Sequence, residues 1–180
     1  GAVGVIDDYR KVISYNSFHI NDEIYLIGTP GTHLSSTAYE RCFFDHKITK
    51  KNSVPPKVDL ASEKNNGNLI SKLINKKIIS ACHDISDGGL LITLLEMCMS
   101  KRVSINFSKQ FKSHAFLFGE DQSRYIITID RIKLKEFEKN IKNKQIQFTK
   151  IGRIIEGNVL KFADNSFINI DEIKKSNLLK

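Results

Sequence analysis

The chain has 180 residues, of which 41% are hydrophobic and 27% charged, with a formal net charge of +8. This length allows one domain with a full core, and the composition is typical of a globular protein, which excludes a disordered or fibrous chain. No apolar run approaches the ~20 residues that span a bilayer, and the first residues lack the features of a signal peptide. We therefore expect a single domain over residues 1–180, located in the cytoplasm, with no membrane partner.

Three cysteines, Cys42, Cys82 and Cys98, show no paired spacing, which predicts free thiols. Cys42 with His46 could supply half of a metal site, but tetrahedral zinc needs further ligands at matching spacing. The lysines are scattered along expected helices and are not combined with aromatic residues, which argues against nucleic acid as a partner. A basic nucleic-acid-binding or assembly module stays as an alternative.

The first part of the chain carries strand-like and loop-like patterns. Residues 1–6 are typical of the end of an entering strand, which is how a fragment begins, and the β-like runs Tyr9–Tyr15 and Glu23–Ile27 predict a hairpin or two neighbouring strands. Residues 34–41 then indicate a capped helix start. The hydroxyl groups of residues 35–37 are expected to cap this helix or to contact an anion, and capping is the commoner role.

The remaining patterns predict alternating helices and strands. In chain order we expect a helix at Asp59–Lys77, a strand at Ile78–Cys82, an apolar buried helix at Gly89–Met99, strands at Val103–Phe107, Phe116–Phe118 and Tyr125–Ile129, a helix at Lys133–Lys142, strands near Phe148–Ile155, Val159–Phe162 and Phe167–Ile170, and a helix from Asp171. Glu96 is the only charge in the apolar helix and needs a partner or a route to water. The fold class predicted is α+β, with a mixed β-sheet and packed helices.

Two polar clusters lie at the ends of expected buried strands, His83–Gly89 and Gly119–Arg124, where folds of this class tend to place sites. A turn that opens a helix through two glycines directs backbone N–H groups and the positive end of the helix dipole at one point, where a phosphate or carboxylate can be held. If the two strands are neighbours, the carboxylates of both clusters approach one another, and they would bind Mg²⁺ with phosphate oxygens as further ligands.

The spacing alone leaves a structural role equally open for these clusters. In that interpretation His83 and Asp84 satisfy the hydrogen-bonding groups of a buried turn, Ser86 or Asp87 caps the following helix, and Glu120 pairs with Arg124.

The residues resemble a known family. His83–Leu90 is similar to the His-Asp-x-Ser-x-Gly-Gly-Leu turn in the last domain of phosphoribosylformylglycinamidine synthase, which belongs to the ATP-dependent superfamily that includes aminoimidazole ribonucleotide synthetase. Further segments match in the same order: residues 1–6 resemble a Val-Gly-Val segment, Glu23–Gly28 a strand ending in Leu-Leu-Gly, Pro55–Leu60 a Pro-Pro-x-Val-Asp lead-in, and Gly119–Tyr125 a Gly-Glu-Ser-Gln-Ser-Arg-Tyr segment. Two departures are that Ser35-Ser36 stands where the family has Gly-Gly, and that Asp121 replaces a serine.

The resemblance implies a fold like the C-terminal domain of aminoimidazole ribonucleotide synthetase, in a fragment that corresponds to the last C-terminal domain of a larger multidomain ligase. With ATP and Mg²⁺, that family converts formylglycinamide ribonucleotide and glutamine-derived ammonia to formylglycinamidine ribonucleotide in de novo purine biosynthesis. The implied partners are the preceding domains of the same chain, a glutaminase subunit or domain, and the nucleotide substrate. The catalytic residues belong to preceding domains, so this fragment alone is expected to be inactive.

We expect a nucleotide or phosphate site formed by His83, Asp84, Ser86, Gly88, Gly89, Glu120, Gln122, Ser123 and Arg124, with Asp84 and Glu120 as the metal ligands. Thiamine-monophosphate kinase, a relative with an Asp-x-Ser-Asp-Gly-Leu turn and a Gly-Glu-Asp segment, is the main alternative. The extra Gly89, the continuation at residues 122–124 and the Pro55-Pro56 lead-in favour the synthase.

Overall fold

A seven-stranded mixed sheet forms the centre of the protein in a computed structural model that describes residues 3–44, 53–111, 113–142 and 146–175. The strand order is β2-β4-β1-β5-β3-β6-β7, and all neighbours are antiparallel except β3 and β6. The strands are β1 (Glu23–Ile27), β2 (Ala81–Asp84), β3 (Val103–Phe107), β4 (Tyr125–Ile129), β5 (Phe148–Glu156), β6 (Val159–Lys161) and β7 (Phe167–Asn169). The α+β class with a mixed sheet, predicted from the sequence, is confirmed.

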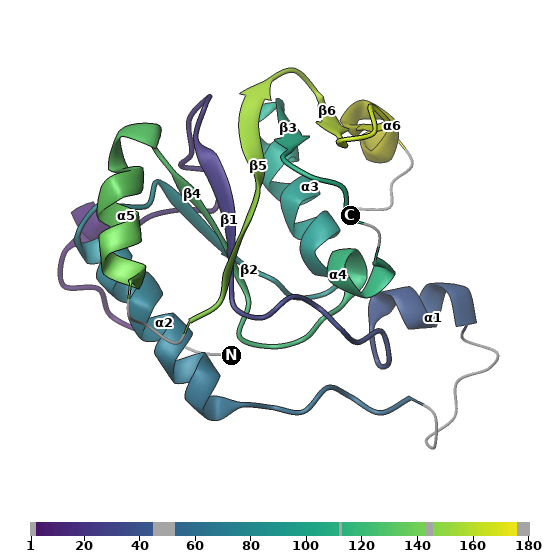
Figure 1. The fold of residues 1–180 in the computed structure, drawn as a ribbon, viewed down its shortest axis with the longest axis horizontal. Coiled ribbons are helices and arrows are strands. Elements are labelled where there is room, and N and C mark those ends of the chain that lie inside the picture. Colours follow the sequence, from purple (N-terminus) through teal and green to yellow (C-terminus); the bar gives the residue numbers. More distant parts are fainter. Residues whose placement is uncertain (1–2, 45–52, 112, 143–145, 176–180) are drawn as a thin grey trace.

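Helices cover both faces of the sheet (Figure 1). They are α1 (Ala38–Phe44), α2 (Leu60–Asn75), α3 (Gly89–Lys101), α4 (His114–Phe118), α5 (Leu134–Ile141) and α6 (Ile170–Lys175), with short 3-10 turns η1 (Tyr9–Lys11) and η3 (Arg131–Lys133). Figure 1 shows α2 and α5 on one side of the central strands and α3 with α4 on the other. The domain therefore has three layers, with a hydrophobic core on each side of the sheet.

The two cores follow from the alternation of side chains along the strands. In β1, Ile24 and Leu26 pack with α3, whereas Ile27 packs with α2 and α5. In β4, Ile126 joins the α3 core and Ile127 joins the opposite one. Successive side chains of a strand point to opposite faces, so a strand with apolar residues at every position is one that is covered on both faces. This expectation for the strand at 125–129 is confirmed.

Two predicted strands are wrong. Residues 9–15 form η1 and irregular backbone, because β1 is already paired on one edge with β4 and on the other with β5 and has no edge left for a hairpin partner. Residues 116–118 belong to α4, where the Ser113 hydroxyl accepts from the N–H of Phe116 and caps the helix. Aromatic packing reinforces this helix, since the rings of Phe111 and Phe116 stack with centroids 4.5 Å apart.

Apart from the strand end expected at residues 1–6, the other expected elements are present, with small shifts of their ends. The largest shift is in β2, which begins at Ala81 and runs to Asp84. Helix α2 runs unbroken through residues 65–67, although they include two asparagines and a glycine. The strand end expected at residues 1–6 is wrong for residues 3–6, which lie outside helices and strands, and residues 1–2 lie outside the described part of the chain.

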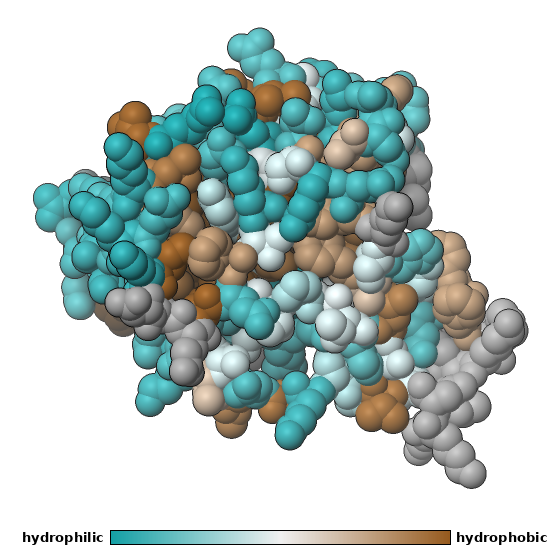
Figure 2. Space-filling view, in the orientation of Figure 1, coloured by the Kyte–Doolittle hydropathy of each residue, from teal (hydrophilic) through white to brown (hydrophobic). Residues whose placement is uncertain are grey.

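The visible surface is mostly polar and the cysteines are unpaired, as the sequence predicts. On the face shown in Figure 2, hydrophilic residues cover most of the surface and the apolar colour is confined to separate patches. All three cysteines are free thiols, and burial raises the pKa of Cys82 and of Cys98 to about 12. Within the described residues, no helix has the length and apolarity that crossing a membrane requires.

Candidate functional site

The two polar clusters meet at one end of the sheet. Strands β2 and β4 pair antiparallel with Asp84 opposite Tyr125, so the loop that leaves β2 lies beside the loop that enters β4. Together they border a cavity of about 450 Å³, which we call the acidic cleft. Its lining residues are Glu63, Asp84, Ile85, Ser86, Asp87, Glu120, Gln122, Ser123, Arg124 and Tyr125. The prediction that the clusters are neighbours is confirmed.

We call the loop that leaves β2 the first loop and the loop that enters β4 the second loop. Two glycines at the end of the first loop allow α3 to start close to the second loop. Gly88 and Gly89 have φ angles of 81° and 73°, in the left-handed region that glycine adopts at little cost. A Cβ at Gly89 would lie 2.6 Å from the carbonyl carbon of Phe118 and 2.7 Å from the carbonyl oxygen of Gly119. The backbones of the two loops therefore touch at Gly89.

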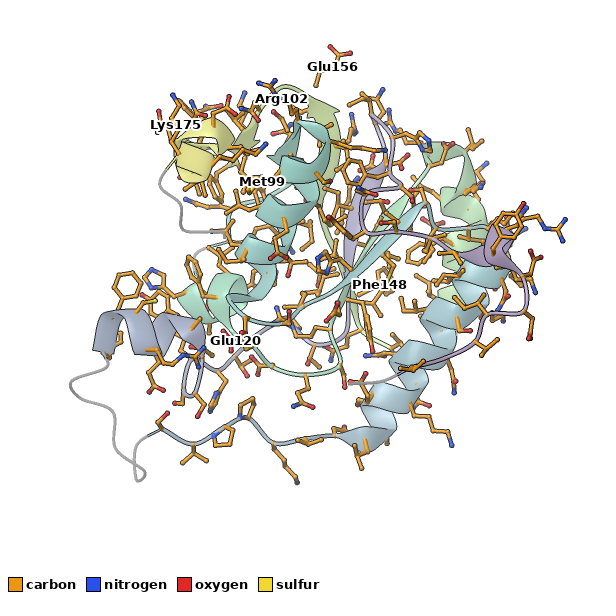
Figure 3. The ribbon with its side chains drawn as sticks, turned by 180° about the vertical axis from the view of Figure 1, so that it is seen from behind. Met99, Arg102, Glu120, Phe148, Glu156 and Lys175 are labelled. Carbon is orange, nitrogen blue, oxygen red and sulfur yellow. The ribbon has the colours of Figure 1, made fainter. Side chains whose placement is uncertain are left out.

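Glu120 occupies the backbone donors that the glycine turn presents. One carboxylate oxygen, Oε1, accepts from the N–H of Gly88 and from the N–H of Ala38, at 2.8 Å in both cases. Figure 3 labels this residue near α1, on the loop that follows α4. These N–H groups stand at the starts of α3 and α1, where a negative charge is favoured. A carboxylate of the protein itself thus fills the position that was expected to bind an external anion.

Arg124 holds the second loop from inside. The side chain is 2% exposed, and its terminal nitrogens donate to the carbonyl oxygens of Gly119, at 2.8 Å, and Phe116, at 3.4 Å. Burial lowers the pKa of this guanidinium, opposed by the nearby charge of Asp121. The Glu120–Arg124 pair that the sequence left open is not formed. The arginine instead fixes the path of the loop between α4 and β4.

Helix α2 supplies a second set of contacts to this loop. Glu63 accepts from the hydroxyl of Ser123, at 2.8 Å, and from the hydroxyl of Tyr125, while Asn66 donates from Nδ2 to the carbonyl oxygen of Ser123, at 2.8 Å. Burial and Glu63 together raise the pKa of Tyr125. Ser123 has a φ of 62°, which is uncommon for a residue with a side chain. Hydrogen bonds from α2 therefore hold the loop at Ser123, where the backbone has a positive φ.

Sequence reasoning missed Glu63 and Tyr125 as lining residues. Glu63 precedes Ser123 by 60 residues and has the pattern of an ordinary helix-surface carboxylate. No local signal distinguishes it from the other acidic residues of the chain.

The first loop, in contrast, presents side chains with few protein contacts. The Asp84 side chain is 70% exposed and lies 3.4 Å from Nδ1 of His83. Ser86 and Asp87 are exposed, and neither side chain makes a hydrogen bond within the described part of the chain. These three residues and the exposed Gln122 of the second loop present side chains of the acidic cleft that a ligand can reach.

Three expected site residues do not line the acidic cleft: His83, Gly88 and Gly89. The ring of His83 packs on Tyr15, with centroids 5.1 Å apart, and its Nε2 lies 3.3 Å from Glu96. His83 and Gly88 instead border a separate, wider cavity of about 970 Å³ beside α3. The half-exposed Glu96 therefore has both the partner and the route to water that its sequence position demanded.

The acidic cleft does not hold a metal site made of protein side chains alone. Among the described residues, no three His, Cys, Asp or Glu side chains gather in a way that could bind a metal ion. Cys42 is exposed, and the His46 proposed beside it lies outside the described residues. Mg²⁺ often uses only one or two carboxylates when phosphate oxygens complete its shell. The donor set fits a magnesium ion that arrives with a phosphate.

The hydroxyl-rich segment before α1 serves as a helix cap. The Thr37 hydroxyl accepts from the N–H of Glu40, at 3.2 Å, and the carboxylate of Glu40 accepts from the N–H of Ser36, at 2.6 Å. Bonds to Ser53 and to the N–H of Ser36 lower the pKa of Glu40. The capping interpretation of residues 35–37 is confirmed for Thr37.

A family model described as "AIR synthase related protein, C-terminal domain" matches residues 20–165. The chain belongs to this family. The chain is 33% identical to phosphoribosylformylglycinamidine synthase subunit PurL of Pelagibacter ubique, over 98% of this chain and 24% of that protein. It thus spans about a quarter of the length of that relative. The resemblance found in the sequence is confirmed.

Solved structures agree on the fold. The structure of T. maritima PurL complexed with FGAR superimposes on 92% of this domain and 30% of that chain, with a TM-score of 0.76 and 12% sequence identity. Thiamine-monophosphate kinase from Stenotrophomonas maltophilia covers 84% of this domain and 52% of that chain, with a TM-score of 0.57 and 18% identity. At such identities the structures establish the architecture alone, and the sequence relatives favour the synthase over the kinase.

Proposed function

We propose that this domain is part of a phosphoribosylformylglycinamidine synthase, the ATP-dependent ligase that makes formylglycinamidine ribonucleotide from formylglycinamide ribonucleotide and glutamine-derived ammonia. The proposal is supported by relatives of that name that match nearly the whole chain. In this role the domain works with preceding domains of the same protein and with a glutaminase, it is cytoplasmic, and alone it is inactive because the catalytic residues lie elsewhere.

Within that enzyme we propose that the acidic cleft binds the phosphates of a nucleotide together with Mg²⁺. One observation carries this proposal. At the edge of the cleft, the side chains of Ser86 and Asp87 make no hydrogen bond within the described residues, and the carboxylate of Asp84 is 70% exposed although it lies 3.4 Å from Nδ1 of His83. Carboxylates repel a bare phosphate, so the ligand must bring a cation. When bound, the magnesium ion neutralises phosphate charge.

The proposed ligand contacts are divided between the two loops. Asp84 is one metal ligand, and Glu120 is the other through its second oxygen, because Oε1 is already engaged by two backbone N–H groups. Ser86 and Gln122 contact phosphate or nucleotide directly. The remaining expected residues shape the site without contacting the ligand. Gly88 and Gly89 allow the turn, His83 supports it from the α3 side, and Ser123 and Arg124 hold the second loop.

Titration calorimetry with Mg-ADP tests the cleft. Asp84→Asn is expected to weaken Mg-ADP binding about tenfold, which corresponds to ~1.4 kcal/mol. Mg²⁺ added alone should give no comparable heat. The matched control is Asp164→Asn, because Asp164 is an exposed carboxylate in the turn before β7, and this variant should bind as the unmodified protein does. Equal affinities of the Asp84 variant and the control contradict the proposal.

A further inference from the structure

A second cavity, of about 470 Å³, shares Gln122 and Ser123 with the acidic cleft. It lies between the loop after β1, the segment that leads into α2, and residues 121–123. We call it the Asn66 pocket, after the α2 side chain in its lining. The proposed function uses neither the pocket nor its remaining lining residues.

Two polar atoms of the Asn66 pocket have no hydrogen-bond partner among the residues that the structure describes. Asn66 is 5% exposed, and its Nδ2 donates to Ser123, but its Oδ1 receives no hydrogen bond from the described residues. His33 lines the same pocket, and its Nδ1 is buried without a partner in the described part of the chain. Buried polar atoms without partners are costly. Of the two atoms, only Nδ1 of His33 is buried in this way, whereas Oδ1 of Asn66 is an acceptor in the pocket lining that no described residue uses. Both atoms are suited to bonds with a bound molecule.

The charges around the Asn66 pocket disfavour an ionic ligand. Asp121 already accepts from the backbone and hydroxyl of Thr32, at 3.3 and 3.4 Å, and Asp59 accepts from the first N–H groups of α2, which lowers its pKa. The one lysine in the lining, Lys57, is exposed. Two carboxylates against one solvated cation do not attract a phosphate. The described residues also offer no cluster that holds a metal.

We propose that the Asn66 pocket binds an uncharged, hydroxyl-rich molecule of the nucleoside class. Its hydroxyl groups bond to Oδ1 of Asn66 and to Nδ1 of His33, which as a neutral imidazole can accept or donate there. Pro56 and Ile146 supply the apolar wall on which a flat ring rests. This site needs neither phosphate nor metal, so it goes beyond the function proposed for the acidic cleft.

Adenosine, which carries no phosphate, is the probe that tests this site by titration calorimetry in the absence of Mg²⁺. His33→Phe keeps a planar ring and removes both nitrogens, and it is expected to weaken adenosine binding about tenfold. The matched control is His114→Phe, because His114 lies on α4 outside the lining of either cavity. Asn66→Leu provides a second variant with the same expected loss, measured alongside its unfolding curve.

The Asp84→Asn variant separates this proposal from the proposed function. Adenosine binding that is weakened by His33→Phe but unchanged in His114→Phe and Asp84→Asn supports the Asn66 pocket, whatever the result with Mg-ADP. The proposal is overturned if adenosine does not bind, if His33→Phe and His114→Phe bind it equally, or if the binding requires Asp84 or Mg²⁺.

Discussion

The two loops of the acidic cleft have similar polar sequences but different roles. In residues 119–124, Glu120, Asp121, Ser123 and Arg124 are all bonded to other parts of the protein. In residues 84–87 the polar side chains make few such contacts. Charge and polarity in a motif therefore do not distinguish a residue that builds a site from one that serves a ligand. The distinction lies in where its hydrogen bonds go.

The largest expected effect comes from the point where the two loops touch. Gly89→Ala should destabilise the domain by about 3–4 kcal/mol, because its Cβ meets the backbone of residues 118–119 and its φ is left-handed. Urea unfolding measures the loss. Gly67→Ala is the control, since nothing lies within 4 Å of its Cβ inside α2, and it should stabilise by about 0.5–1 kcal/mol. Similar curves for both variants would contradict the close approach of the loops.

Next in size is the removal of the buried arginine from the second loop. Arg124→Met should cost about 2–3 kcal/mol, because the carbonyl groups of Gly119 and Phe116 lose their donor. Thermal and urea unfolding measure the change. Arg131→Met is the control: Arg131 is half-exposed, and its partner Glu23 keeps two further cations, so a change below about 0.5 kcal/mol is expected. Equal effects of the two variants would show that Arg124 does not support the loop.

Glu120→Ala should have a smaller effect, about 1–2 kcal/mol, because two backbone N–H groups lose their acceptor. Hydrogen exchange at Gly88 and Ala38 gives the direct measurement, and both should exchange faster. Glu120→Gln retains a side-chain oxygen and should show less than half of this change. Unaltered exchange in the alanine variant would mean that the carboxylate does not join the starts of α1 and α3.

The smallest effect on stability is expected for the first loop. The double variant Asp84→Asn with Asp87→Asn should unfold within about 0.5 kcal/mol of the original protein, as exposed substitutions usually do. Chemical unfolding is the measurement. A loss comparable to that of Arg124→Met would remove the contrast between the loops.

Much of the fold could be predicted because apolar periodicity reports burial directly. The run at 125–129 indicated a strand covered on both faces, and the run at 89–99 indicated a buried helix. The strand predicted at 9–15 failed because a single segment does not reveal that both edges of β1 are taken. The strand predicted at 116–118 failed because the Ser113 cap and the aromatic stacking outweigh the local preference for a strand.

The candidate site was only partly predictable for a related reason. The meeting of the two clusters follows from the pairing of β2 with β4, which the sequence left as a condition because apolar runs indicate strands but not which strands pair. The partners of Glu120 and Arg124 are backbone N–H and carbonyl groups, which every residue carries and no sequence pattern marks. Glu63 reaches Ser123 from a separate helix, so only the tertiary structure assigns it to the cleft.

Ser123 lines both the acidic cleft and the Asn66 pocket. Two residues of α2 bind it: Glu63 accepts from its hydroxyl, and Asn66 donates to its carbonyl oxygen. A ligand bound in one of these proposed sites that moved Ser123 would therefore change the free energy of ligand binding in the other site. Thermodynamic linkage makes this effect reciprocal. A nucleotide in the acidic cleft that raises the affinity of the Asn66 pocket for its ligand severalfold has its own affinity raised by the same factor when that ligand is bound. If both cavities bind ligands as proposed, the contacts of α2 with Ser123 would couple the two binding equilibria.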